Sequence, residues 1–316
     1  MKQGGRSFLI LLAIVICALS GSAQRSAAPE PVRTITISSE PNAKVFIGGI
    51  LYGKTSAQGT LEIKTVAPGP HILTLRAVGF KEKSQPLPAA ARGEIKVALA
   101  KTTDEAELAF QEAERLLSRD RQKAIAAYKN AVKLRPNYPE ALVALARVQA
   151  DDLDIEGALK SLQTARRLRP GYAEASAVEG RIHKDNDEEA QAIAAFKRAI
   201  AEGKGFQPEA YTGLGLLYKE KAEMYGGASD FANESASYSE SAKNLRTALK
   251  QLSGAPDSVV IYQLLGLVYE RQKKYSDAIA LYEEFLKFFP DLPESESVRS
   301  FIVQLRKEQS EQQPPE

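Results

Sequence analysis

Small residues recur every 34 positions through the middle of this chain. Ala124, Ala158 and Ala192 are 34 residues apart, and each is followed four residues later by a large side chain and seven residues later by an alanine. These followers are Tyr128 and Ala131, Leu162 and Ala165, and Phe196 and Ala199. A period of this length accommodates one pair of helices, with small residues where the helices cross and large residues filling the gap between them. The spacing therefore predicts a stack of helical hairpins from about residue 104 onward.

The best copy of the repeat lies near the C-terminal end. It consists of the segment Tyr262–Tyr269 followed by Tyr275, Ala278, Tyr282 and Pro290. These residues resemble the tetratricopeptide repeat, which implies an all-α solenoid, a right-handed superhelix of helical hairpins with a concave groove. We count five repeats over residues 105–292, beginning near Glu105, Pro139, Ala173, Pro208 and Val259. A capping helix at 294–307 and a disordered tail at 308–316 are expected to follow, because the last repeat needs a polar outer face.

The fourth repeat is longer than its neighbours. The small residue of its first helix, Gly215, precedes that of its second helix, Ser241, by 26 residues, whereas this separation is 12 residues in repeats two, three and five. The excess of 14 residues corresponds to about four helical turns, so each helix can gain about two turns without rotating its packing face. We expect a projecting helical hairpin around residues 222–236, with Gly226 and Gly227 as its turn.

Residues 32–100 follow a pattern with a period of two. Short β-rich runs separated by proline and glycine predict a small all-β unit. The runs are Thr34–Ile37, Val45–Ile47, Leu61–Ile63, Ile72–Leu75 and Ile95–Leu99. The turns between them include Glu40-Pro41-Asn42, Gly48-Gly49, Ala67-Pro68-Gly69 and Val78-Gly79-Phe80. These turns resemble the PEGA domain, which implies a β-sandwich that serves as a non-catalytic module on envelope proteins. A multidomain chain is therefore expected, with a PEGA-like sandwich followed by a solenoid.

One segment of the β unit fits a nucleotide-binding motif. Gly48–Thr55 matches the phosphate-loop pattern, in which two glycines precede a lysine and a threonine. Such a loop needs a helix that begins at the lysine and threonine, so that backbone N–H groups converge on the phosphates. Ser56–Thr60 and another predicted strand follow instead. We interpret the glycines as turn residues and expect no cofactor.

The composition offers little for catalysis. One cysteine and two histidines leave few residues for thiol chemistry, a zinc site or a histidine-dependent triad. We therefore predict no catalytic residue and no metal site, and the protein is not expected to be an enzyme. A carboxylate-based hydrolase is a remote alternative, because the acids of helical repeats lie in solvent, where little shifts their pKa values.

The first 23 residues have the pattern of a secretory signal. Lys2 and Arg6 precede the apolar run Phe8–Leu19, and small residues lead up to Ala23. We expect cleavage after Ala23, a linker at 24–31, and a periplasmic or extracellular protein. The alternative is an uncleaved anchor, but the run has 12 residues and a spanning helix needs about 20. Removing Lys2 and Arg6 brings the formal net charge from +2 to zero, so no nucleic-acid partner is predicted.

These features favour a non-catalytic exported scaffold that binds a protein or peptide in its groove, with the β unit associated with an envelope component. An accessory factor of a secretion, pilus or outer-membrane assembly machine is the main alternative.

The resemblance to the tetratricopeptide repeat also places residues in the groove. Positions 2, 5, 9 and 12 of each first helix line it in that family, and in this chain they include a column of cations. Arginine and lysine on successive repeats suit a carboxylate, so we expect an acidic or C-terminal peptide; alternatively, the cations pair with the glutamates beside them. The candidate residues are Arg147, Arg181, Lys184, Lys219, Glu140, Glu174, Thr212 and Gln263.

Overall fold

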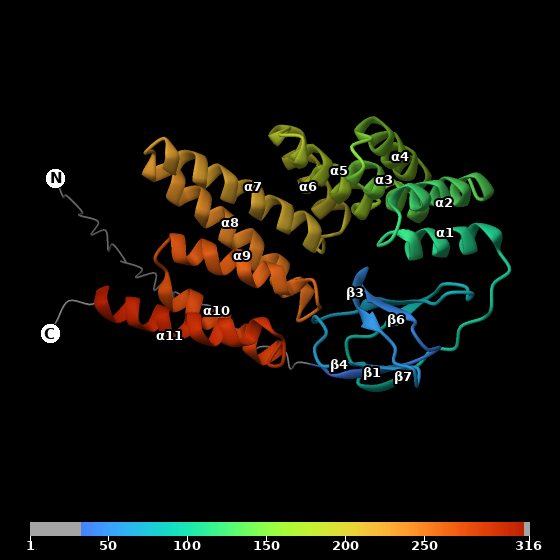
Figure 1. The fold of residues 1–316 in the computed structure, drawn as a ribbon, viewed down its shortest axis with the longest axis horizontal. Helices are drawn as coiled ribbons and strands as arrows, with labels where there is room; N and C mark the ends of the chain where they lie inside the picture. Colours follow the sequence, from blue (N-terminus) through green and yellow to red (C-terminus); the bar gives the residue numbers. More distant parts are fainter. Residues whose placement is uncertain (1–32, 313–316) are drawn as a thin grey trace, which may run out of the picture. The chain divides into compact units, whose positions relative to one another are not determined.

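A computed structural model describes residues 33–312, which lie within one compact unit, Val32–Glu316. In this range seven strands are followed by eleven helices (Figure 1). The predicted signal segment, its cleavage point and the linker lie outside the described residues, as do residues 313–316. Between residues 33 and 312, no helix combines the length and the hydropathy needed to cross a membrane.

The seven strands form two small sheets, which we call the β-module. The strands are β1 (Ile35–Ser38), β2 (Lys44–Ile47), β3 (Ile50–Lys54), β4 (Thr60–Ile63), β5 (His71–Arg76), β6 (Lys83–Leu87) and β7 (Gly93–Lys96). In one sheet β1 pairs antiparallel with β4 and parallel with β7, and the other is antiparallel with the order β3-β2-β5-β6. Alternate residues point inward, so that Ile35 and Ile37 of β1 and Leu73 and Leu75 of β5 are fully buried. This small all-β unit is the one predicted from the period of two.

The segment that fits the phosphate-loop pattern lies in the β2–β3 hairpin. Gly48 and Gly49 form its two-residue turn with φ angles of +60° and +83°, the conformation in which glycine is favoured. Thr55 is buried in the β-module, and its hydroxyl donates to the carbonyl oxygen of Glu40 at 2.6 Å. The next element is β4 and not a helix.

Consecutive helices pack against each other in five pairs. They are α1 (Glu105–Leu116) with α2 (Arg121–Leu134), α3 (Pro139–Asp151) with α4 (Ile155–Leu168), α5 (Ala173–Asp185) with α6 (Glu189–Glu202), α7 (Pro208–Gly227) with α8 (Phe231–Leu252), and α9 (Ser258–Arg271) with α10 (Tyr275–Phe288). The first helices begin within one residue of the five predicted repeat starts. A methyl group on Gly180 would lie 2.6 Å from the Phe196 ring, and one on Gly215 would lie 2.6 Å from Leu245, so small residues are required where the helices cross.

The fourth pair carries the predicted extension (Figure 1). Helices α7 and α8 have 20 and 22 residues, whereas α3 to α6 have 13 or 14. The turn lies at residues 228–230 rather than at Gly226 and Gly227, which still belong to α7. Asp230 caps α8, since its carboxylate accepts a hydrogen bond from the backbone N–H of Asn233 at 3.2 Å.

A final helix, α11 (Glu294–Gln312), packs on α10 at the position predicted for a capping helix. It continues to Gln312, whereas a tail is expected from residue 308. Gln309 contributes to this longer helix by donating to the hydroxyl of Ser276 at 2.7 Å.

The β-module forms hydrogen bonds with helix α1 and with the end of helix α8. At α1, the side chain of Gln111 accepts from the N–H of Gly79 and donates to the carbonyl oxygen of Phe80, both at 2.8 Å, and Glu107 accepts from the N–H of Glu82 at 2.6 Å. At the end of α8, the hydroxyl of Tyr52 donates to the carbonyl oxygen of Leu252 at 3.1 Å. Two separate parts of the solenoid are thus joined by one small module.

Candidate functional site

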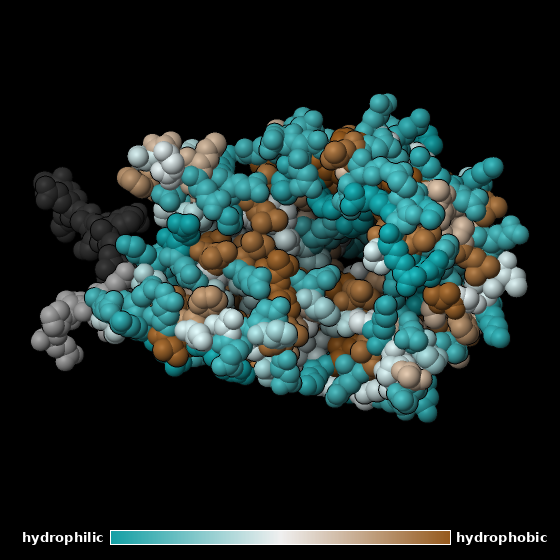
Figure 2. All heavy atoms as spheres, in the orientation of Figure 1, coloured by the Kyte–Doolittle hydropathy of each residue, from teal (hydrophilic) through white to brown (hydrophobic). Residues whose placement is uncertain are grey.

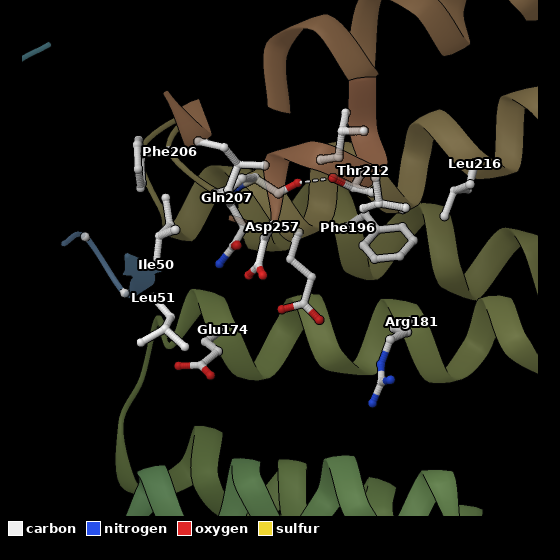
Figure 3. A pocket seen from close by; sticks show the side chains of 18 of the residues that line it. Ile50, Leu51, Glu174, Arg181, Phe196, Phe206, Gln207, Thr212, Leu216 and Asp257 are labelled. Atoms are coloured by element: carbon white, nitrogen blue, oxygen red, sulfur yellow. Dashed lines mark hydrogen bonds between the residues drawn. The ribbon is translucent and has the colours of Figure 1, made fainter. Parts of the chain in front are cut away.

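A cavity of about 740 Å³ lies between the β2–β3 hairpin and the first helices of the repeats. We call it the groove cavity. Its walls come from the β2–β3 hairpin, from the first helices α3, α5, α7 and α9, from the loop before α7, and from single residues of α6 and α8, Phe196 and Leu252. The space-filling view shows a hollow on this face of the molecule (Figure 2), and Figure 3 shows the side chains around it. The cavity is the concave groove expected for the repeats, with the β-module forming one wall.

Five of the eight predicted site residues line this cavity, namely Arg147, Arg181, Lys184, Glu174 and Thr212. The other three are placed elsewhere. Glu140 pairs with Arg169, Lys219 lies 2.7 Å from Glu223, and Gln263 is exposed on α9.

Arg147 is held by carboxylates on neighbouring helices. Its Nη1 and Nη2 donate to the two oxygens of Glu209 at 2.7 and 2.5 Å, and Nη2 also lies 3.5 Å from Glu174. Although burial by itself lowers the pKa of Arg147, the two carboxylates raise it above its usual value. Arg147 therefore ties α3 to α7 across the groove and has its donors already engaged.

Arg181 has the same place in the next repeat but a different environment. Its Nη1 lies 3.3 Å from Asp151, while Nε and Nη2 are buried with no hydrogen-bond partner. These two nitrogens form the edge of the guanidinium that binds a carboxylate with two parallel hydrogen bonds. Arg115 uses that edge on Glu112, with distances of 2.7 and 2.6 Å. The donor edge of Arg181 thus has no acceptor among the described residues, although Arg181 lines the cavity.

The remaining polar residues of the groove cavity are partly engaged. Lys184 lies 2.8 Å from Asp185 and 3.8 Å from Glu220. The hydroxyl of Thr212 donates to the carbonyl oxygen of Pro208 at 2.8 Å, the contact drawn as a dashed line in Figure 3. Burial raises the pKa of Asp257, and Glu209 adds to this effect.

The β-module contributes apolar side chains to this cavity that were not expected from the sequence. They come from Phe46, Ile50 and Leu51. Near these residues Phe206, in the loop before α7, lies against His71 of the β-module, with ring centroids 5.5 Å apart. A methyl group on Gly48 would lie 3.1 Å from Phe206, so the glycine turn approaches this ring closely.

A departure from the repeat marks this contact in the sequence. Counted from the preceding helix, Phe206 corresponds to Tyr138 and Tyr172, each of which is covered by an arginine 4.4 Å from its ring centroid. Gly203 stands where those arginines would be expected. Phe206 therefore lacks the arginine at this position and packs against His71 of the β-module instead.

Two segments of the chain, residues 109–182 and 259–292, match tetratricopeptide repeat families. The chain therefore contains tetratricopeptide repeats, as predicted, and proteins built from these repeats generally mediate protein–protein interactions. The comparison with curated proteins gives no significant match.

Three solved structures resemble part of this chain. Yeast Tom70 has a TM-score of 0.52 and 15% identity, and the match covers 66% of this chain and 41% of that one. A thermophilic tetratricopeptide repeat protein of Thermus thermophilus has a TM-score of 0.46 and 19% identity, covering 63% of this chain and 98% of that one. The MamA protein has a TM-score of 0.41 and 24% identity, covering 60% of this chain and 94% of that one. At these identities, the likeness to Tom70 supports a shared fold alone.

Proposed function

We propose that this protein is a scaffold whose groove cavity binds a protein or peptide segment through an acidic group, and that Arg181 pairs with that group. The observation that carries the proposal is the buried donor edge of Arg181, whose Nε and Nη2 have no hydrogen-bond partner. Leaving buried N–H groups unpaired costs about 1–3 kcal/mol. A ligand carboxylate that accepts hydrogen bonds from Nε and Nη2 removes this cost, which favours binding. The sequence pattern assigns this role to a column of cations, but Arg147 is engaged by Glu209.

Selection from a random library of eight-residue peptides tests this function. We expect the wild-type protein to enrich peptides that contain aspartate or glutamate, or that present a free C-terminal carboxylate. Arg181→Gln should abolish this enrichment and leave the melting temperature within about 2 °C. The ion pair that it loses, with Asp151 at 3.3 Å, is partly exposed and such a pair contributes less than about 1 kcal/mol, and Nε and Nη2 have no partner to lose. Arg119→Gln, on an exposed arginine outside the cavity, is the matched control and should select like the wild type. Undiminished acidic enrichment by Arg181→Gln would contradict the proposal.

We further propose that the protein is exported and acts at the cell envelope. The support is the basic start, the apolar run and the small residues before Ala23, together with the resemblance of the β-module's turns to the PEGA domain. The expected mature protein begins at Gln24. Intact-mass measurement of the exported protein checks this, and retention of residues 1–23 in that sample would refute it.

A further inference from the structure

The groove cavity has an apolar end and a cationic end. Figure 3 shows Ile50 and Leu51 at one side of the view and Arg181 at the other. Leu51 is half-buried, and Val260 of α9, which also lines the cavity, leaves 52% of its surface exposed. Apolar side chains that remain exposed inside a cavity can gain from burial against a ligand.

Negative charge accompanies the apolar end. Glu174, Glu209 and Asp257 all lie in or next to the first turns of the helices that line the cavity, and the raised pKa of Asp257 reflects burial beside Glu209. Glu174 and Arg181 are seven residues apart on α5, which is about 10 Å along the helix axis. Arg147 lies among these carboxylates and is bound by Glu209, so the unpaired donor edge that remains for a ligand carboxylate is that of Arg181.

We infer that the β2–β3 hairpin determines which peptide the groove accepts, because Ile50 and Leu51 line the same cavity as Arg181, whose Nε and Nη2 have no hydrogen-bond partner. This inference rests on the function proposed above. The occupant is a peptide that carries a large aliphatic residue, which contacts the hairpin, and an acidic residue, which pairs with Arg181. The β-module is then part of the binding site as well as a neighbour of the solenoid.

The way the hairpin is held supports this role. Its turn packs on Phe206 through Gly48, and Tyr52 on β3 donates to the carbonyl oxygen of Leu252 at 3.1 Å. Because the hairpin is fixed against the loop before α7 and against the end of α8, Ile50 and Leu51 are held in a defined position at the cavity, as a preorganised subsite requires.

Three fluorescent octapeptides of glycine and serine test the inference. The first carries leucine at the second, third and fourth positions before a glutamate, so that the test covers several spacings. The second replaces these leucines with serine, and the third replaces the glutamate with glutamine. By fluorescence anisotropy we expect the wild-type protein to bind the first peptide about tenfold more tightly than the second, and more tightly than the third. Leu51→Ser should reduce the leucine preference to about twofold or less and keep the preference for glutamate.

Two further variants complete the design. Leu51→Met should retain the leucine preference, and Val78→Ser, at a β-module residue that is 75% exposed and outside the cavity, should bind like the wild type. Thermal denaturation of each variant establishes that it is folded. A Leu51→Ser protein that is folded and keeps the full leucine preference overturns the inference while the proposed function stands. Failure of the wild-type protein to distinguish glutamate from glutamine overturns the proposed function, and the inference with it.

Discussion

At the scale of single residues, equivalent positions in successive repeats differ in their partners. Arg147 and Arg181 are 34 residues apart and both line the groove cavity. Glu209 binds Arg147 bidentately, whereas the edge of Arg181 formed by Nε and Nη2 has no partner. A carboxylate that is already bound occupies the donors that a ligand would use. The repeat register places both arginines in the groove, but only their neighbours distinguish a structural residue from a binding residue.

Leu153, in the turn between α3 and α4, should respond to a change in backbone preference. Its φ angle is +65° and its side chain is 85% exposed, so it takes the left-handed conformation without gaining contacts. That conformation costs a residue with a Cβ atom about 1–2 kcal/mol, and glycine avoids this cost. Glycine also loses more backbone entropy on folding, which offsets part of the gain. We expect Leu153→Gly to increase the free energy of unfolding by about 0.5–1 kcal/mol in urea titrations. Leu153→Ala, which keeps the Cβ, is the control, and a glycine variant less stable than the alanine variant would disprove the explanation.

At the scale of helices and strands, the repeats depart from their pattern where they contact the β-module. Helix α1 presents Glu107 and Gln111, both buried polar residues, to the backbone of the β-module. In the third repeat Gly203 replaces the expected arginine, and Phe206 packs on His71. Residues that depart from the repeat pattern thus make contacts with the β-module.

The sequence predicts contacts between neighbouring segments of the chain better than contacts between distant segments. Each hairpin packs on its neighbours in the chain, so the helix starts and the long α7–α8 pair can be inferred from local spacing. The alternating β-runs are equally local. Leu51 lines the same cavity as Arg147, which lies about 100 positions later in the chain. Local periodicity contains no information about two segments so far apart. For that reason the sequence predicts Arg181 and Thr212 in the groove but not Ile50 or Leu51.

At the scale of the whole molecule, the two contacts of the β-module fix one wall of the groove cavity. Tyr52 is central to the contact with α8, because it is 8% exposed and its hydroxyl donates to the carbonyl oxygen of Leu252. Burial raises the pKa of Tyr52 to about 12, against smaller opposing effects of the Ala67 backbone and Arg33. In the unfolded chain a tyrosine ionises near pH 10. The stability that neutral Tyr52 contributes is therefore complete below about pH 10 and lost as the pH rises toward 12.

Tyr52→Phe tests this contact. We expect the variant to be less stable than the wild type at pH 8 by about 1 kcal/mol, the contribution of one buried hydrogen bond. The difference should shrink at about pH 11, because phenylalanine has no proton to lose. Urea unfolding at the two pH values measures both effects, with Tyr225→Phe in the projecting hairpin as the control. An equal difference at both pH values would show that Tyr52 does not titrate as its burial predicts.

Nuclear magnetic resonance tests the central claim, that solenoid and β-module share one ligand site. The full chain, labelled with ¹⁵N, is titrated with the leucine- and glutamate-containing octapeptide. We predict that the backbone signals of Gly48–Leu51 and of Arg181 shift together and saturate at the same peptide concentration, because both line the groove cavity. Shifts confined to residues outside this cavity, or shifts at Arg181 with none at Gly48–Leu51, would contradict a shared site.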